Sequence, residues 1–254
     1  MKVRILGCGA SGGVPSLSHR WGECDPTNPK NKRTRTSILI EEKGFHLLID
    51  SSPDMRFQLI EAGFPKIDAV VFTHVHADHI GGADDLRCFT YEKPLPLFIN
   101  KTETEEFKKR MSYVFEVIEN NEKFVPKFKI IPIEKNTLFK AGPFQVQTIE
   151  QLHGPGKSLG LRIGNFSYNT DLVAFESGNL EALKGVETLI LGCPSPNRME
   201  KHLNLEEALE WIDEVKPKRA ILTHMGIRMD YDKLKKTLPS YIEPAYDGME
   251  FEIP

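Results

Sequence analysis

The stretch Val70-Val71-Phe72-Thr73-His74-Val75-His76-Ala77-Asp78-His79-Ile80-Gly81-Gly82 decides how the rest of the chain is interpreted. A short apolar run, typical of a buried strand, ends in three histidines and one aspartate within six positions. Burying these imidazoles and this carboxylate together costs free energy unless a cation binds them. The stretch therefore predicts a metal site, and a histidine-rich surface turn is the alternative.

The spacing of the four side chains indicates two metal ions rather than one. His74 and His76 are two residues apart on an extended segment, so both imidazoles can point toward one ion. Asp78 and His79 follow where the chain turns into a helix, and they face a second position further along. The apolar run before the motif and Gly81-Gly82 after it disfavour a surface turn.

Length and composition exclude several classes of protein. A chain of 254 residues with 40% hydrophobic residues can bury a substantial core. The net charge of −3 argues against a general nucleic-acid or membrane-surface protein. The four cysteines form no CxxC pair, which disfavours a disulfide framework and a thiolate zinc site. No signal peptide or membrane-spanning run is recognisable, so we expect a cytoplasmic protein.

His74-x-His76-x-Asp78-His79 resembles the signature of the metallo-β-lactamase superfamily of dinuclear hydrolases. The resemblance implies an α+β fold, the αββα sandwich of two mixed β-sheets flanked by helices, in a single domain over residues 1–254. It also implies two divalent metal ions, and histidine and aspartate ligands suit Zn²⁺ or Mn²⁺.

The rest of the chain contains the other side chains that this family requires. His153 follows an expected strand over 144–149, Asp171 follows one over 166–169, and His224 ends a strand that repeats the Thr-His ending of the central stretch. By resemblance, one ion would be bound by His74, His76 and His153, the other by Asp78, His79 and His224, with Asp171 bridging them. Without the resemblance, His153 would be a surface histidine and Asp171 a turn cap.

Asp50 and His202 are candidates for supporting roles. Asp50 ends an expected strand over 45–49, where it could either cap a turn or accept a hydrogen bond from a metal-binding imidazole. His202 precedes an expected helix whose start, Asn204 and Glu207, resembles a capping box. His202 is either a solvated loop residue or a general acid beside the metal site.

Within the superfamily the chain looks most like the PhnP-type enzymes, which open cyclic ribose phosphates. The resemblance rests on 7–15, Asp84-Asp85-Leu86-Arg87, His202-Leu203-Asn204-Leu205 and Tyr246-Asp247-Gly248-Met249-Glu250. His202 and Asp78 would then be catalytic, and Ser11 and Arg87 would contact the substrate. Arg87 could equally form an ion pair with Asp84 or Asp85. PhnP-type proteins often carry several cysteines in the first long loop, but here only Cys24 is present, so we expect no structural zinc.

This resemblance implies a phosphodiesterase acting on phosphoribosyl 1,2-cyclic phosphate or a related small, nucleotide-like phosphodiester. Two ions about 3.5–4 Å apart would activate one water for in-line attack on phosphorus. His202 would protonate the departing oxygen. The alternatives are a transfer-RNA 3′-processing nuclease, a glyoxalase II-like thioesterase, and a metal-binding relative without activity.

Two segments and the oligomeric state stay open at this level. The basic cluster of Lys30, Lys32, Arg33 and Arg35 is either solvated or supplies cations to an anionic substrate, nucleic acid included. Residues 102–128 read as one or two helices with a buried aromatic face, or as a substrate lid. A homodimer is one option for the assembly.

Overall fold

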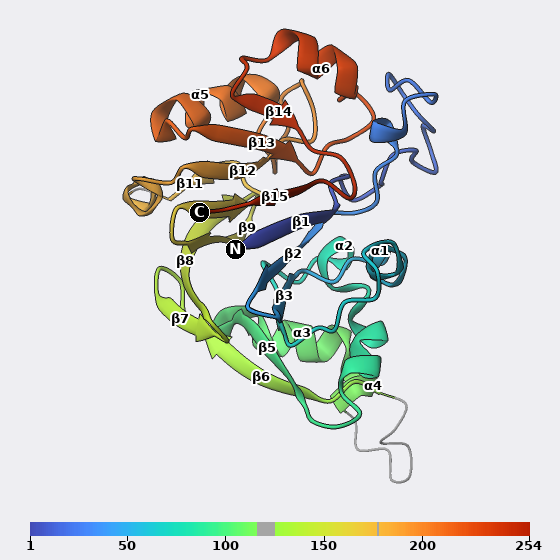
Figure 1. The fold of residues 1–254 in the computed structure, drawn as a ribbon, viewed down its shortest axis with the longest axis vertical. Coiled ribbons are helices and arrows are strands. Elements are labelled where there is room, and N and C mark those ends of the chain that lie inside the picture. The colour runs from blue at the N-terminus through green and yellow to red at the C-terminus, as the bar shows by residue number, and fades with distance from the viewer. Residues whose placement is uncertain (116–124, 177) are drawn as a thin grey trace.

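The computed structural model describes residues 1–115, 125–176 and 178–254 (Figure 1). The strands of the first half are β1 (Lys2–Gly7), β2 (Ser37–Glu42), β3 (Phe45–Ile49), β4 (Ala69–Val71), β5 (Leu95–Asn100), β6 (Phe128–Ile133) and β7 (Leu138–Ala141). Those of the second half are β8 (Phe144–His153), β9 (Gly156–Ile163), β10 (Phe166–Asn169), β11 (Ala174–Phe175), β12 (Thr188–Gly192), β13 (Arg219–Thr223), β14 (Ile242–Pro244) and β15 (Glu250–Glu252). The α-helices are α1 (Met55–Glu61), α2 (Ala77–Ile80), α3 (Thr104–Arg110), α4 (Ser112–Phe115), α5 (Leu205–Val215) and α6 (Tyr231–Thr237).

The described strands form two mixed sheets. The first has the order β15-β1-β2-β3-β4-β5-β6, and its strands from β3 to β6 run parallel. The second has the order β11-β8-β9-β10-β12-β13-β14, parallel from β10 to β14, with β7 paired to β8. Helices α1 to α4 lie beside the first sheet and α5 and α6 beside the second (Figure 1). This arrangement confirms the predicted α+β fold of two mixed sheets flanked by helices.

Alternation of apolar side chains along the strands explains the layers. In β2, Ile38 and Ile40 belong to the larger core, which contains residues of both sheets, while Leu39 between them belongs to a second core with α1 and α3. Leu48 and Val70 also belong to this second core, on the face of the sheet that the helices cover. Because successive side chains of a strand point to opposite faces, strands β1 to β6 contribute to both cores. Both faces of the first sheet are therefore buried.

Most predicted elements are present, with shifted ends. His153 is the last residue of β8 rather than a loop residue beyond it, because the β8–β9 ladder continues to the pair His153–Gly156. Helix α1 begins at Met55, and the Asp54 carboxylate just before it forms an ion pair with Arg35. In 102–128, α3 and α4 match the predicted helices, whereas 116–124 lie outside the described residues.

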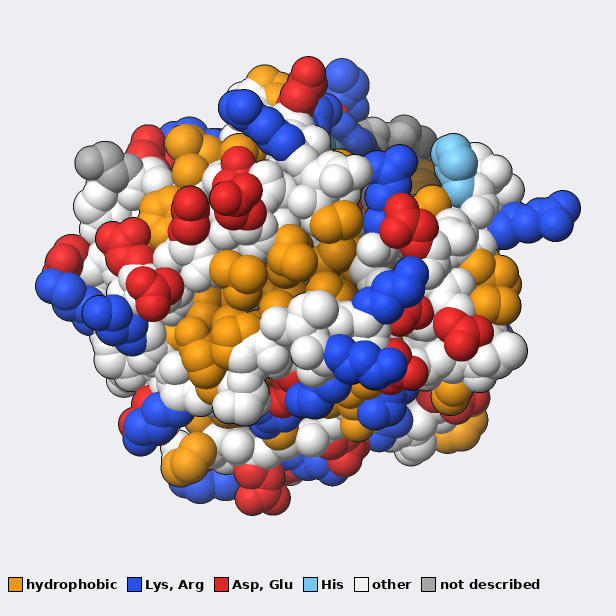
Figure 2. Space-filling model, turned by 90° about the horizontal axis from the view of Figure 1, so that it is seen from above, with side chains coloured by type: hydrophobic (Ala, Val, Ile, Leu, Met, Phe, Trp, Pro, Cys, Tyr) orange, Lys and Arg blue, Asp and Glu red, His pale blue; other side chains and the backbone are white. Residues whose placement is uncertain are grey.

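Figure 2 shows the molecule from above, with hydrophobic side chains gathered across the middle of that face and charged groups around them. Leu209 of α5 and Leu238 just after α6 pack against the larger core while staying partly exposed. Among the described residues, no helix is long and apolar enough to cross a membrane.

Candidate metal centre

The ends of several strands bring the predicted side chains together. His74 and His76 follow β4, and Asp78 and His79 stand in α2 directly after them. His153 ends β8, Asp171 follows β10, and His224 follows β13. Two segments about 150 residues apart in sequence, each a parallel strand ending in Thr-His, thus meet at one site. All seven residues that resemblance predicted as ligands lie in this cluster.

The first donor group consists of His74, His76 and His153. Their ring nitrogens lie within 4.8 Å of one another. His76 Nδ1 is 2.9 Å from His74 Nε2 and 3.2 Å from His153 Nε2. Burial, followed by the charge of neighbouring histidines, holds the pKa of His74 well below its ordinary value and lowers that of His76. Both shifts favour the neutral imidazole at His74 and His76, the form in which histidine binds a metal.

The second donor group consists of Asp78, His79, Asp171 and His224. Asp171 Oδ2 lies 3.2 Å from His79 Nε2, and its Oδ1 lies 3.3 Å from His224 Nε2. The same Oδ1 is 3.9 Å from His153 Nε2 in the first group. The Asp171 carboxylate thus stands between the two groups, at the position that a bridging ligand would occupy.

The charge balance of the second group favours a cation. Burial raises the pKa of a carboxyl group, but His224 and His79 outweigh it and hold the pKa of Asp171 well below its usual range. Burial likewise opposes protonation of His79, but Asp171 and Asp50 overcome it and raise its pKa. His79 Nε2 is buried and finds no hydrogen-bond partner among the described residues. An orphaned nitrogen between Asp78 and Asp171 fits a divalent cation as its missing partner.

Asp50 orients ligands of both groups. His79 Nδ1 donates to Asp50 Oδ2 over 2.7 Å. The Thr73 hydroxyl donates to the same carboxylate over 2.8 Å, which leaves its oxygen free to accept from His74 Nδ1 at 3.1 Å. Both histidines then present Nε2 to the cluster. Of the two roles considered for Asp50, the structure favours the hydrogen bond to an imidazole.

Two further histidines are oriented by groups that the sequence did not single out. His153 Nδ1 donates to the backbone carbonyl of Lys201 at 2.8 Å. His224 Nδ1 lies 3.2 Å from the Thr36 hydroxyl, which donates its own proton to the Gly9 carbonyl. Each contact leaves Nε2 as the free nitrogen. The sequence around the Lys201 carbonyl and around Thr36, which is far from His224 in the chain, gives no indication that they orient histidines.

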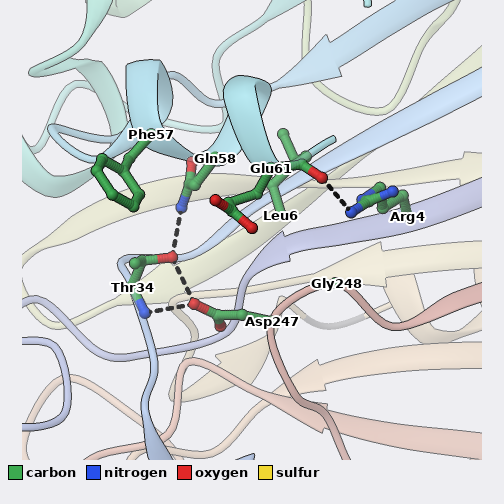
Figure 3. Close-up of a pocket in the computed structure, with 8 residues that line it drawn as sticks. All are labelled: Arg4, Leu6, Thr34, Phe57, Gln58, Glu61, Asp247 and Gly248. Atoms are coloured by element: carbon green, nitrogen blue, oxygen red, sulfur yellow. Dashed lines mark hydrogen bonds between the residues drawn. The ribbon is translucent and has the colours of Figure 1, made fainter. Parts of the chain in front are cut away.

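A network of hydrogen bonds fixes the loop that carries Thr36, the residue whose hydroxyl contacts His224. Asp247 accepts hydrogen bonds from the backbone amide and hydroxyl of Thr34 over 2.7 and 2.6 Å, and Gln58 donates to the same hydroxyl (Figure 3). Asp247 also accepts from the amide of Cys8. The closing Tyr246-Asp247-Gly248 motif thus holds together the first strand end and the Thr34–Thr36 loop.

His202 lies at the edge of the cluster. Its Nδ1 is 3.6 Å from Asp171 Oδ1, and its ring stacks on that of His224 with centroids 5.1 Å apart. Burial is the main cause that lowers the pKa of His202 to about 4. His202 is thus a member of the site and is not a solvated loop residue.

Arg87 and Ser11, the two predicted substrate contacts, each have a partner within the protein. Arg87 forms an ion pair with Asp84, as the alternative prediction had it, and lines a different, largely apolar hollow beside α1. Ser11 accepts a hydrogen bond from Arg35 through its carbonyl. In the basic loop, Arg33 is buried and Arg35 pairs with Asp54. The suggestion that this loop supplies cations to a substrate is therefore not supported for these two arginines.

Glu103 is a pocket residue that the sequence did not indicate. It lies beside His74 and His76 in a pocket of about 160 Å³ that Lys157 and Lys201 also line. Burial raises the pKa of its carboxyl group to about 7, although a hydrogen bond from the Val75 amide works in the opposite direction.

Three residues of the site adopt a left-handed backbone. The φ angles of Asp50, Asp171 and His224 are 62°, 49° and 56°. Each follows a strand end, where the reversal of the backbone turns the side chain into the cluster. Such conformations are disfavoured for residues with a Cβ atom and occur mostly at functional positions.

Comparison with known proteins places this site in a family. A β-lactamase superfamily domain model matches residues 46–225, which include all seven clustered side chains from His74 to His224. The chain belongs to the metallo-β-lactamase superfamily. Proteins of this fold bind divalent metals, so the superfamily and the donor chemistry agree.

Several known proteins are similar to this chain over most of its length. An octanoyltransferase of Porphyromonas gingivalis is 31% identical over 98% of this chain, which spans 51% of that protein's length. The anti-Pycsar protein Apyc1 of Paenibacillus harenae is 31% identical over 78% of this chain and 86% of its own. The crystal structure of a diphosphatase from the PhnP family superposes with a TM-score of 0.90 at 27% identity, covering 100% and 98% of the two chains. The family model and the diphosphatase neighbour support a hydrolase.

Proposed function

We propose that this protein is a dinuclear metal-dependent phosphodiesterase that opens a cyclic ribose phosphate, of the phosphoribosyl 1,2-cyclic phosphate type, or a related small phosphodiester. The observation that carries the proposal is the position of Asp171 between two complete donor groups, with the His202 imidazole at 3.6 Å.

Each donor group has a set of ligands that suits a divalent ion such as Zn²⁺ or Mn²⁺. His74, His76 and His153 would bind one ion, Asp78, His79 and His224 the other, and Asp171 would contact both. Two bound ions would supply an activated water at neutral pH and offset negative charge on the phosphoryl oxygens. Asp50 would keep His79 and, through Thr73, His74 in the required orientation.

Two side chains of the site would handle protons. Asp78 would orient the attacking water by accepting a hydrogen bond from it. His202 would donate a proton to the departing ribose oxygen. This role requires the phosphate anion to raise the His202 pKa from its low value in the unliganded protein, as an adjacent negative charge does.

The size of the pocket supports a small substrate. Its volume of about 160 Å³ lies below the roughly 300–1,000 Å³ of pockets that enclose drug-sized ligands. A phosphate with a sugar ring attached matches this scale better than a folded RNA. The second candidate is hydrolysis of a diphosphate, which the similarity to the PhnP-family diphosphatase favours.

Metal analysis and a substrate panel test the proposal on one preparation. The panel contains bis(p-nitrophenyl) phosphate, phosphoribosyl 1,2-cyclic phosphate, a nucleoside diphosphate, a thioester and a precursor transfer RNA. We expect two metal ions per chain and cleavage of the phosphodiesters. Asp171→Ala should abolish cleavage and His202→Ala should reduce it by about 100-fold or more. His19→Ala, in an exposed loop, is the matched control.

Other outcomes would identify the alternatives. Preferred cleavage of the diphosphate, the thioester or the transfer RNA would name a different branch of the superfamily. A protein that binds two ions but cleaves nothing would be a binding protein, and failure to bind metal under saturating conditions would refute the proposal.

A further inference from the structure

Two lysines line the pocket beside the first donor group, and they differ in their partners. Lys157 Nζ is held by Glu150 at 2.5 Å and by Glu176 at 3.4 Å. Lys201 Nζ takes part in no ion pair or hydrogen bond with any residue that the structure describes. The positive charge of Lys157 is therefore neutralised within the protein, whereas that of Lys201 is available to a ligand.

The backbone and stem of Lys201 are fixed although its ammonium group is free. The Lys201 carbonyl accepts the 2.8 Å hydrogen bond from His153 Nδ1, which ties the residue to the first donor group. Its stem crosses Gly154, where a Cβ atom would come within 2.7 Å of Lys201 Cγ. Gly154 also has a φ of 58°, which favours glycine at this position. The ammonium group is thus anchored within reach of the pocket.

Glu103, which lines the same pocket, does not neutralise Lys201. Its carboxyl group accepts a hydrogen bond from the Val75 amide, and its Oε2 is buried without a partner. No ion pair joins Glu103 to either lysine among the described residues. The Lys201 ammonium group and the metal-loaded cluster would therefore offer two separate positive positions to one ligand.

We propose that Lys201 is a specificity-determining residue that binds a second anionic group of the substrate while the scissile phosphodiester lies at the metal centre. This inference rests on the proposed function and narrows it to phosphodiesters that carry an additional phosphate. The 5-phosphate of a phosphoribosyl cyclic phosphate is a group of this kind. Lys201 would contribute to binding and not to the chemical step.

Kinetics with matched substrates test this proposal on the metal-loaded protein. The substrates are phosphoribosyl 1,2-cyclic phosphate, the same compound without its 5-phosphate, and bis(p-nitrophenyl) phosphate. We expect Lys201→Gln to lower kcat/KM about 10- to 100-fold for the first substrate only, mainly through KM. Lys201→Arg should retain most of the activity. Metal content should be unchanged, because the carbonyl that contacts His153 is part of the backbone.

Two further variants test whether Lys201 or Lys157 binds the second anionic group. Lys218→Gln, just before β13 and paired with Glu187, should behave like wild type. A loss in Lys157→Gln that exceeds the loss in Lys201→Gln would overturn the proposal. So would an equal loss on all three substrates, or no loss.

A binding measurement distinguishes failure of this proposal from failure of the proposed function. If wild type cleaves no phosphodiester, the proposed function fails, and calorimetric titration with ribose 5-phosphate then decides the role of Lys201. Binding to wild type that weakens about tenfold or more in Lys201→Gln would support it. Equal binding by both proteins, or none by wild type, would refute it.

Discussion

Asp50 and His79, both completely buried, are joined by a 2.7 Å hydrogen bond between Oδ2 and Nδ1. Because Thr73 donates to the same carboxylate and accepts from His74, one aspartate orients an imidazole in each donor group. We expect Asp50→Asn to weaken metal binding about 10- to 100-fold, since partners of ligating histidines have effects of this size. Competition with a chromophoric chelator measures this change.

The matched control is Asp68→Asn. Asp68 stands just before β4, at the opposite end of the strand from His74, and accepts from the His46 amide. Its substitution should leave metal affinity unchanged. Wild-type affinity in Asp50→Asn would show that the hydrogen bond does not tune the ligands.

Thr36 should have a similar but smaller effect at the second donor group. Thr36→Val removes the oxygen that faces His224 Nδ1 at 3.2 Å while nearly preserving the shape of the side chain. We expect about tenfold weaker binding of one metal ion, with Thr36→Ser close to wild type. Stepwise calorimetric titration resolves the two binding events, and equal weakening of both would contradict the assignment.

Metal removal should lower the thermal stability. A ligand at 100 times its Kd that binds only the folded state adds about 2.7 kcal/mol to the free energy of unfolding. For a chain of this length we expect chelation to lower Tm by roughly 5–10 °C. Calorimetry before and after chelation tests this, with Asp171→Ala, which lacks the shared carboxylate, showing a much smaller shift. An unchanged Tm in wild type would argue against ions that link the two sheets.

Glu103 should make the metal-free protein less stable as pH rises. Its carboxyl group ionises near pH 4.5 in the unfolded chain and near pH 7 in the folded protein. Between these values the folded state holds a proton that the unfolded state has released, so stability falls as pH increases through this window. Glu103→Gln should therefore exceed wild type by on the order of 1–3 kcal/mol at pH 8, with the difference shrinking toward pH 5. Denaturant unfolding at both pH values measures this, and a constant difference would contradict the mechanism.

Prediction from sequence succeeded where chemistry is local in the chain. His74, His76, Asp78 and His79 lie within one short motif, and His153, Asp171 and His224 each lie at or just after the end of a recognisable strand. The fold followed from the resemblance that this motif carries. The strand β14 was not predicted, because its Pro244 disfavours the backbone hydrogen bonds of a β-sheet. Thr36, the Lys201 carbonyl and Glu103 escaped because their roles depend on contacts between segments far apart in sequence.

The left-handed backbone at Asp50, Asp171 and His224 has a consequence for anyone who engineers this protein. Glycine would relieve the backbone strain at each of these positions, which costs about 1–3 kcal/mol each. A screen for thermostable variants would therefore select glycine there. The same substitutions would delete a carboxylate or an imidazole from the centre. Stability of the metal-free protein and metal binding therefore compete at the same positions, and selection for heat resistance in the absence of metal should favour well-folded proteins that have lost the centre.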